Sequence, residues 1–281
     1  MQNTAIICQE EPVPGDTGKE ITDEHCTKVS ANSYKIAGKD IALPVNIGAA
    51  AMLMNIFVVD AKKAQQLIAD SGFKVVEIWP GKALMQLLGV DYQQNDLGDY
   101  NEAAIVFPVT TPGQSKPLPV IGSALRIAKG SLSSYVYRMP VNQGFTTHAG
   151  RFIWGFPKWV TEVDIQFGPK TAAATFNDDG ELVFSIHAAT GGKSSAKPQA
   201  APSLAIRNGH AWKTIGTTEG EGLTFKLGGR VPDIGETHPL AVTLRDLGLP
   251  KKPLCTISMR KAVMQFAGPE SVPIGQPFSS S

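Results

Sequence analysis

The sequence has few of the features that mark nucleic-acid-binding, disulfide-linked or membrane-spanning proteins. Its 281 residues carry a formal net charge of +1 and no basic cluster interleaved with aromatic residues, so its charge favours neither nucleic acid nor an anionic membrane. Three cysteines without a Cys-x-x-Cys pair argue against a disulfide framework. The most apolar stretch, 47–59, is too short to span a bilayer. The N-terminus lacks the pattern of a secretory signal, so we expect a soluble, cytoplasmic protein without nucleic-acid or membrane partners.

Sequence motifs for three common chemistries are also absent. The five histidines show neither His-x-His nor His-x-x-x-His spacing, and none pairs with a cysteine at ligand-like spacing. There is no Gly-x-Ser-x-Gly elbow for a serine nucleophile and no glycine-rich strand–turn–helix fingerprint for a nucleotide. We therefore expect no metal and no cofactor.

Short strand-like runs separated by turns dominate the chain, which contains 28 glycines and 20 prolines. One clear helix is predicted at 61–70, with Asp60 as its N-cap and Gly72 at its end, and a helical turn at 239–247. We predict a mainly β (α+β) single domain at 34–270, closed or nearly closed, with an arm at 1–33 and a tail at 271–281 that frays. Strands are expected at 34–43, 75–79, 83–90, 102–109, 132–139, 160–167, 171–176, 181–188, 204–206, 214–218, 222–227 and 261–266. Polar loops are expected at 93–99 and 190–202.

One lysine, Lys158, lies among aromatic residues in a chain that is only 7% aromatic. If rings enclose the amine, its charged form is disfavoured, and a neutral amine can form a Schiff base with a ketone. Gly150 and Gly155 indicate close backbone approach in this segment. The alternative is an exposed lysine in a Phe-Pro-Lys turn, because most lysines face water. The rings are those of Phe152, Trp154, Phe156 and Trp159.

The pattern Gly150-Arg151-x-x-x-Gly155-Phe156-Pro157-Lys158 resembles the active-site segment of the acetoacetate decarboxylase family. The likeness extends over roughly 45–267 and includes the loop from Gly98 to Glu102 and the stretch 223–229. It implies a cone-like antiparallel β-barrel with a few peripheral helices, and assembly into a homo-oligomer. It also implies that Lys158 is the Schiff-base nucleophile and that Glu102 faces the substrate and handles protons.

Four positions depart from the family pattern. Trp159 stands where the family has a second lysine, and Phe152 where it has a glutamate. Gln86 is the nearest counterpart of a second active-site glutamate, and 49–59 contains no arginine to hold a substrate carboxylate. These differences favour a larger or less charged keto compound than acetoacetate.

Six residues are predicted to contact the substrate around Lys158 and Glu102. For Arg151, a role in a structural ion pair is favoured over a role in the wall of the site. For His148, a structural or exposed role is favoured over a place in the lining of the site. The six are Gln86, His148, Arg151, Trp154, Phe156 and Trp159.

Three functional hypotheses follow. The first is a carboxy-lyase that decarboxylates a β-keto acid, or acts on a related carbonyl compound, through an imine on Lys158. The second is an aldolase-, dehydratase- or hydratase-type enzyme that uses the same imine. The third is a non-catalytic protein whose apolar pocket holds a small molecule and in which Lys158 is an ordinary charged side chain.

Overall fold

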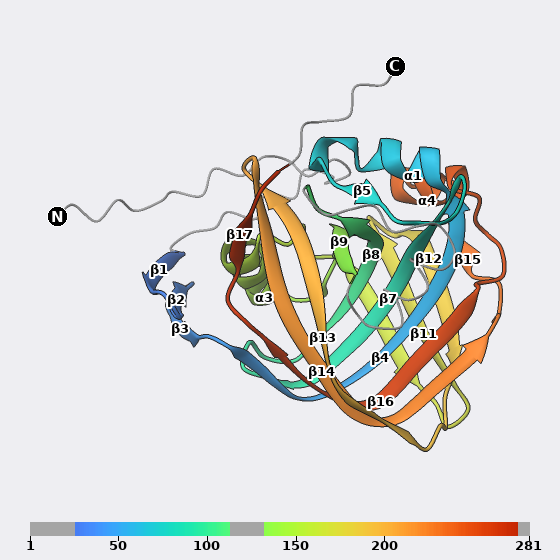
Figure 1. The fold of residues 1–281 in the computed structure, drawn as a ribbon. Helices are drawn as coiled ribbons and strands as arrows, with labels where there is room; N and C mark the ends of the chain where they lie inside the picture. Colours follow the sequence, from blue (N-terminus) through green and yellow to red (C-terminus); the bar gives the residue numbers. More distant parts are fainter. Residues whose placement is uncertain (1–25, 113–131, 275–281) are drawn as a thin grey trace.

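A ten-stranded sheet that closes on itself forms the centre of the computed structural model, which describes residues 26–112 and 132–274. The closed ring runs β8–β9–β13–β14–β16–β4–β7, and β7 pairs back onto β8 (Figure 1). All neighbours in the ring are antiparallel except β9 and β13, which are parallel. The ring strands are β4 (Val45–Asp60), β7 (Lys82–Asn95), β8 (Tyr100–Thr110), β9 (Ser133–Arg138), β13 (Ser194–Arg207), β14 (His210–Leu227) and β16 (Cys255–Phe266). The remaining members are β5 (Lys74–Val75), β6 (Glu77–Trp79) and β17 (Glu270–Val272). The mainly β prediction with ring closure is confirmed.

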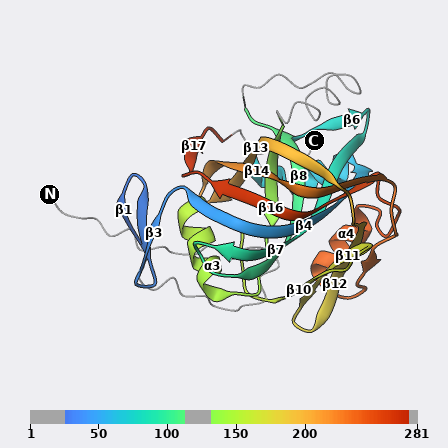
Figure 2. The same cartoon turned by 90° about the horizontal axis from the view of Figure 1, so that it is seen from below.

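A second sheet packs against the outside of β4, β7 and β8 (Figure 2). It consists of β10 (Glu162–Phe167), β11 (Thr171–Asp178), β12 (Glu181–Ala189) and β15 (Asp233–Ile234). Its apolar side chains join one core cluster with those of the ring strands, so these three strands are covered on both faces.

Strand β4 shows why the sequence there is almost continuously apolar. Leu53, Phe57 and Val59 belong to the core shared with the second sheet. Met52 and Met54, which alternate with them, line a cavity inside the ring. A strand buried on both faces loses the usual alternation of polar and apolar residues.

Helices lie at the rim of the ring. The predicted N-cap is confirmed, because Asp60 Oδ1 accepts a hydrogen bond of 3.0 Å from the Lys63 amide at the start of α1 (Ala61–Leu67). A short 3₁₀ turn (Ala69–Ser71) follows and ends at Gly72, in the left-handed conformation. Helix α4 (Pro239–Asp246) lies beside α1 (Figure 1). Helix α3 (Gly144–Ala149) continues into a π-helical turn, Gly150–Trp154. None of the helices in the described parts is long and apolar enough to cross a membrane.

A small sheet of β1 (Thr27–Ser30), β2 (Ser33–Ile36) and β3 (Lys39–Ala42) precedes the ring. It contacts the π-helical turn through the rings of Tyr34 and Phe152, whose centroids are 6.1 Å apart at 86°. The segment 34–43, for which strand was expected, is a hairpin in which β2 pairs with β3. Most of the predicted arm, 1–25, lies outside the described residues.

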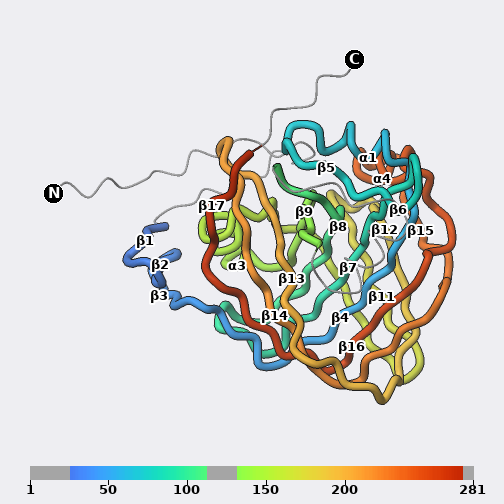
Figure 3. The backbone as a smooth tube through the Cα atoms, in the orientation of Figure 1, coloured from blue at the N-terminus to red at the C-terminus, as the bar shows by residue number. Residues whose placement is uncertain are grey.

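The local structure differs from the prediction in four places. The loop expected at 190–202 is mostly strand, because β13 begins at Ser194 and pairs with β14; Pro198 falls at an irregularity in the pairing, where no ladder bond is needed. Strand β7 extends through 93–95, and β17 pairs with β14 (Figure 3) where a frayed tail was expected. Helical residues at 144–154 were missed. Residues 275–281 of the predicted tail lie outside the described part.

Candidate functional site

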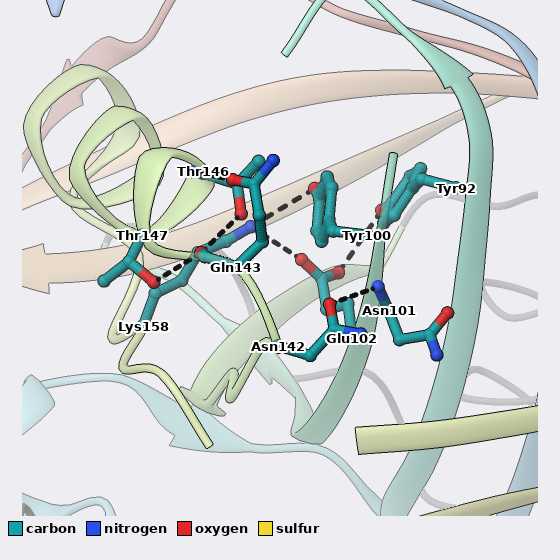
Figure 4. A network of polar contacts seen from close by, with 9 residues as sticks. All are labelled: Tyr92, Tyr100, Asn101, Glu102, Asn142, Gln143, Thr146, Thr147 and Lys158. Atoms are coloured by element: carbon teal, nitrogen blue, oxygen red, sulfur yellow. Dashed lines mark hydrogen bonds and ion pairs between the residues drawn. The ribbon is translucent and has the colours of Figure 1, made fainter. Parts of the chain in front are cut away.

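The site is built around an amine and a carboxylate that contact each other inside the ring. Lys158 Nζ lies 2.7 Å from Glu102 Oε2, and the two side chains are only 4% and 7% exposed (Figure 4). Lys158 is thus not the tip of an exposed turn. Two charged groups removed from water need each other, because either one alone would lose its hydration without compensation.

A short ladder of backbone hydrogen bonds brings these distant residues together. Residues 139–142 run between the start of β8 and the Lys158 segment. The Ala103 amide donates to the Pro140 carbonyl at 2.9 Å, and on the other side the Val141 amide donates to the Trp159 carbonyl at 3.0 Å. Isolated bridges from Val141 to Glu102 and to Val160 complete this arrangement. Backbone pairing therefore fixes the amine relative to the carboxylate.

Gly150 provides the space through which the lysine side chain passes. A Cβ atom at this position would lie 2.5 Å from Lys158 Cδ and 2.7 Å from Cε. The chain folds back here, because the Phe156 amide donates to the Gly150 carbonyl at 3.1 Å and Gly155 takes the left-handed conformation with φ 73°. The close approach expected from the two glycines is present at both positions.

Two tyrosines complete the polar group. The rings of Tyr92 and Tyr100 stack with centroids 4.5 Å apart, and Tyr92 Oη donates to Glu102 Oε1 at 3.3 Å. Lys158 Nζ donates to Tyr100 Oη at 3.3 Å (Figure 4). Burial, followed by the negative charge of Glu102, raises the pKa of both phenols well above the usual value. Both therefore stay protonated and remain hydrogen-bond donors at neutral pH.

Sequence reasoning did not single out either tyrosine. Tyr100 stands two residues before Glu102, and in a strand such residues point to the same face, so this signal was available. Tyr92 is opposite Tyr100 in the pairing of β7 with β8, and no local pattern gives that register.

The pair faces a cavity of about 210 Å³ inside the ring. Most of its lining is apolar, and Lys158 and Glu102 are the only charged side chains among the described residues that line it. The apolar lining includes Met52, Met54, Leu88, Val90, Val136, Met139, Trp154, Phe156, Met264 and Phe266. A mostly apolar pocket with a few convergent polar groups is typical of small-molecule sites.

Three of the predicted substrate-contacting residues line this cavity. Trp154 and Phe156 stack with centroids 6.1 Å apart, and the Trp154 indole donates to the Ala267 carbonyl at 2.8 Å. Gln86 also lines the cavity, but it pairs with Val106, four residues along β8 from Glu102. At about 3.3 Å per residue, this places Gln86 about 13 Å along the strands from the carboxylate. It does not occupy the place of a second carboxylate beside the amine.

The other three do not line the cavity. Trp159 packs in the core cluster of the second sheet, where its indole donates to Asp178 Oδ1 at 3.2 Å. It therefore does not line the cavity, although contact with the substrate was expected from its position next to Lys158. The backbone carbonyl of Arg151, which is buried, accepts a hydrogen bond from the Arg207 guanidinium. His148 is half-buried on α3.

Comparison with known proteins identifies the family. The family model described as acetoacetate decarboxylase (ADC) matches residues 34–226, more than half of the chain. The chain belongs to the acetoacetate decarboxylase family. Comparison with curated proteins gave no match.

Solved structures share the fold of this chain at low identity. An acetoacetate decarboxylase superposes with a TM-score of 0.55 and 13% identity, covering 82% of this chain and 89% of its own. The acetoacetate decarboxylase of Legionella pneumophila gives 0.54 and 14%, covering 83% and 88%. The enduracididine biosynthesis enzyme MppR, complexed with pyruvate, gives 0.51 and 12%, covering 82% and 91%. Proteins described by different names thus share this fold, and the fold by itself does not select one reaction.

Proposed function

We propose that this family member is a carboxy-lyase that forms a Schiff base on Lys158 with a β-keto acid or a related carbonyl compound. The observation that carries the proposal is the buried contact of 2.7 Å between Lys158 Nζ and Glu102 Oε2, at the wall of an apolar cavity. Transfer of one proton along this hydrogen bond gives an amine and a carboxylic acid. The neutral amine formed in this way is the nucleophile that Schiff-base formation requires.

Each step of the proposed reaction uses these groups. The neutral amine attacks the carbonyl carbon, and a proton passes from the nitrogen to the carbonyl oxygen to give a neutral carbinolamine. The hydroxyl leaves as water with the proton of Glu102, which leaves an iminium ion beside the Glu102 carboxylate. The iminium nitrogen then accepts the electron pair of the breaking C–C bond, and carbon dioxide departs. Protonation of the enamine carbon and hydrolysis return Lys158 as the free amine.

The two tyrosines support this role for Glu102. Tyr92 donates to Oε1, while Lys158 donates to Oε2, so the carboxylate is held in one orientation. A fixed carboxylate next to the reacting nitrogen avoids the reorganisation that solvent would need.

An aldolase-, dehydratase- or hydratase-type reaction through the same iminium is the second candidate. One observation favours it: among the described residues, no cation other than Lys158 lines the cavity to hold a substrate carboxylate. Pyruvate, the ligand of the MppR complex, is a keto acid, which fits carbonyl chemistry of either type. Carbon dioxide release from a panel of β-keto acids separates the two candidates.

Borohydride trapping tests the shared step. Incubation with a keto acid and borohydride, followed by mass analysis of peptides, is expected to show a reduced adduct on Lys158. Lys158→Ala should give no adduct and no turnover. An unmodified Lys158 in the native protein would instead favour a binding protein in which the ion pair persists. Light scattering of the same sample tests the expected homo-oligomer.

A further inference from the structure

The cavity has two chemically different ends, and this arrangement defines a class of substrate. We infer that the site takes an elongated carbonyl compound, with its carbonyl group at Lys158, an apolar chain along the ring interior, and a neutral hydrogen-bonding group at the far end. This inference rests on the proposed function for the orientation of the carbonyl group.

The strand register fixes the direction of the cavity. Every second residue of β8 lines it, from Tyr100 and Glu102 to Ala104 and Val106. The opposite residues of β7 also line it, from Tyr92 at the reactive end to Gln86 beside Val106. The lining therefore follows the strands for about 13 Å beyond Glu102. Acetone or pyruvate would occupy only the first part of this length.

The middle of the cavity is apolar and adaptable. Four of the chain's seven methionines line it, and thioether side chains adjust their shape to apolar ligands more readily than branched ones. Leu88, Val90 and Ala104 add further apolar surface between the two ends. Removal of an apolar chain from water is the main gain that such a lining offers. The methionines are Met52, Met54, Met139 and Met264.

The far end is polar but carries no charge among the described residues. Val106 is flanked by Gln86 on β7 and Val136 on β9. Two residues further along β9, Ser134 pairs with Pro108 and with Ser203 of β13. Gln86, Ser134 and Ser203 all line the cavity and are half-buried, whereas Tyr100, Glu102 and Lys158 are buried. Amide and hydroxyl groups donate and accept hydrogen bonds, so they suit a hydroxyl, amide or carbonyl group on the ligand.

Equilibrium binding of unreactive analogues tests the cavity without imine formation. Calorimetry would use straight-chain secondary alcohols of increasing length and the same alcohols with a second, terminal hydroxyl group. The affinity is expected to rise about fourfold for each added methylene until the chain passes Val106. The terminal hydroxyl should then strengthen binding further. An affinity that does not change with chain length would overturn the inference.

A matched pair of variants tests the far end. Gln86→Leu should reverse the preference, so that the plain long alcohol binds better than its hydroxylated partner. Gln93→Leu makes the same change at an exposed position on the same strand and should preserve the native preference. Equal preferences in the two variants would refute the assignment of the far end.

Borohydride trapping with methyl ketones, from acetone to methyl heptyl ketone, separates this inference from the proposed function. Adducts on Lys158 that form at lower concentrations of the longer ketones support both. Length-dependent alcohol binding without any adduct would reject the Schiff-base proposal and leave the elongated cavity in place as a binding site.

Discussion

Lys158 Nζ and Glu102 Oε2 are 2.7 Å apart in the interior of the protein, although 56 residues separate them in the sequence. Each charged group offsets the hydration that the other loses on burial. The same contact therefore affects both stability and chemistry, and the two effects can be measured separately.

A double-mutant cycle measures how much this contact contributes to the free energy of unfolding. Glu102→Gln and Lys158→Met should each lower the free energy of unfolding by about 3–5 kcal/mol, because each leaves one buried group without its charged partner. The double variant should lose less than the sum of the two, because no unpaired charge remains. Urea unfolding of the four proteins provides the values. Additive losses would show that the two groups do not interact.

The chemical effect concerns proton transfer. Glu102→Gln cannot exchange a proton with the amine or with the carbinolamine, so the rate of borohydride-trapped imine formation should fall by about 10²–10⁴. The measurement is the trapping rate at saturating ketone. Tyr34→Phe, a change of one hydroxyl outside the cavity lining, is the control and should retain the native rate. A native rate in Glu102→Gln would remove this residue from the proposed reaction.

Gly150→Ala should displace the lysine without breaking the fold. Gly150 has helical φ and ψ of −62° and −44°, which alanine adopts freely, but its Cβ would lie 2.5 Å from Lys158 Cδ. A shift of about 1 Å in a reacting group can lower a rate about a hundredfold, so slow trapping is expected, with a smaller loss of stability than in Lys158→Met. Gly144→Ala, in the same helical segment with no atom within 4 Å of the added Cβ, is the matched control. Equal trapping rates in the two variants would contradict this role of Gly150.

Asp178 should be required for stability, because it lies fully buried between Trp159 and His238. Its Oδ1 accepts from the Trp159 indole at 3.2 Å, and its Oδ2 is 3.4 Å from His238 Nε2. Asp178→Leu should lower the free energy of unfolding by about 1–3 kcal/mol, since both partners lose a polar neighbour in the core. Asp164→Leu, on the exposed face of β10, should change it by less than about 0.5 kcal/mol in the same urea titration. Similar losses of the free energy of unfolding in both variants would contradict this role of Asp178.

The buried phenol of Tyr135 should lower the free energy of unfolding at alkaline pH. Burial raises its pKa to about 12, against the opposing positive charge of Arg138. Because the folded value is raised, the contribution is complete below the unfolded tyrosine value of about 10 and is lost as the pH rises towards 12. In this window the native free energy of unfolding should fall more steeply than that of Tyr135→Phe, by about 1.4 kcal/mol per pH unit. If urea titrations show that both proteins lose stability equally as the pH rises, the raised pKa of Tyr135 is contradicted.

The sequence by itself determined the local features of this protein. The carboxylate of Asp60 begins α1 because a side-chain acceptor satisfies a free amide, and this requires only neighbouring residues. The Asp-Gly turn at 179–180 joins β11 to β12 for a similar reason, since glycine takes the left-handed conformation at no steric cost. The aromatic surroundings of Lys158 were also visible as composition, and the family motif added Glu102.

Only the tertiary structure decided which of these residues meet. Trp159 follows Lys158, but successive residues of an extended chain point to opposite sides, so the indole joins the outer core while the amine enters the cavity. The pairing of β7 with β8 placed Tyr92 beside Glu102 and moved Gln86 to the far end. Strand register depends on pairing between distant segments, and a shift of one residue would turn each side chain to the other face. The sequence of one strand therefore does not determine which residues of another strand it will face.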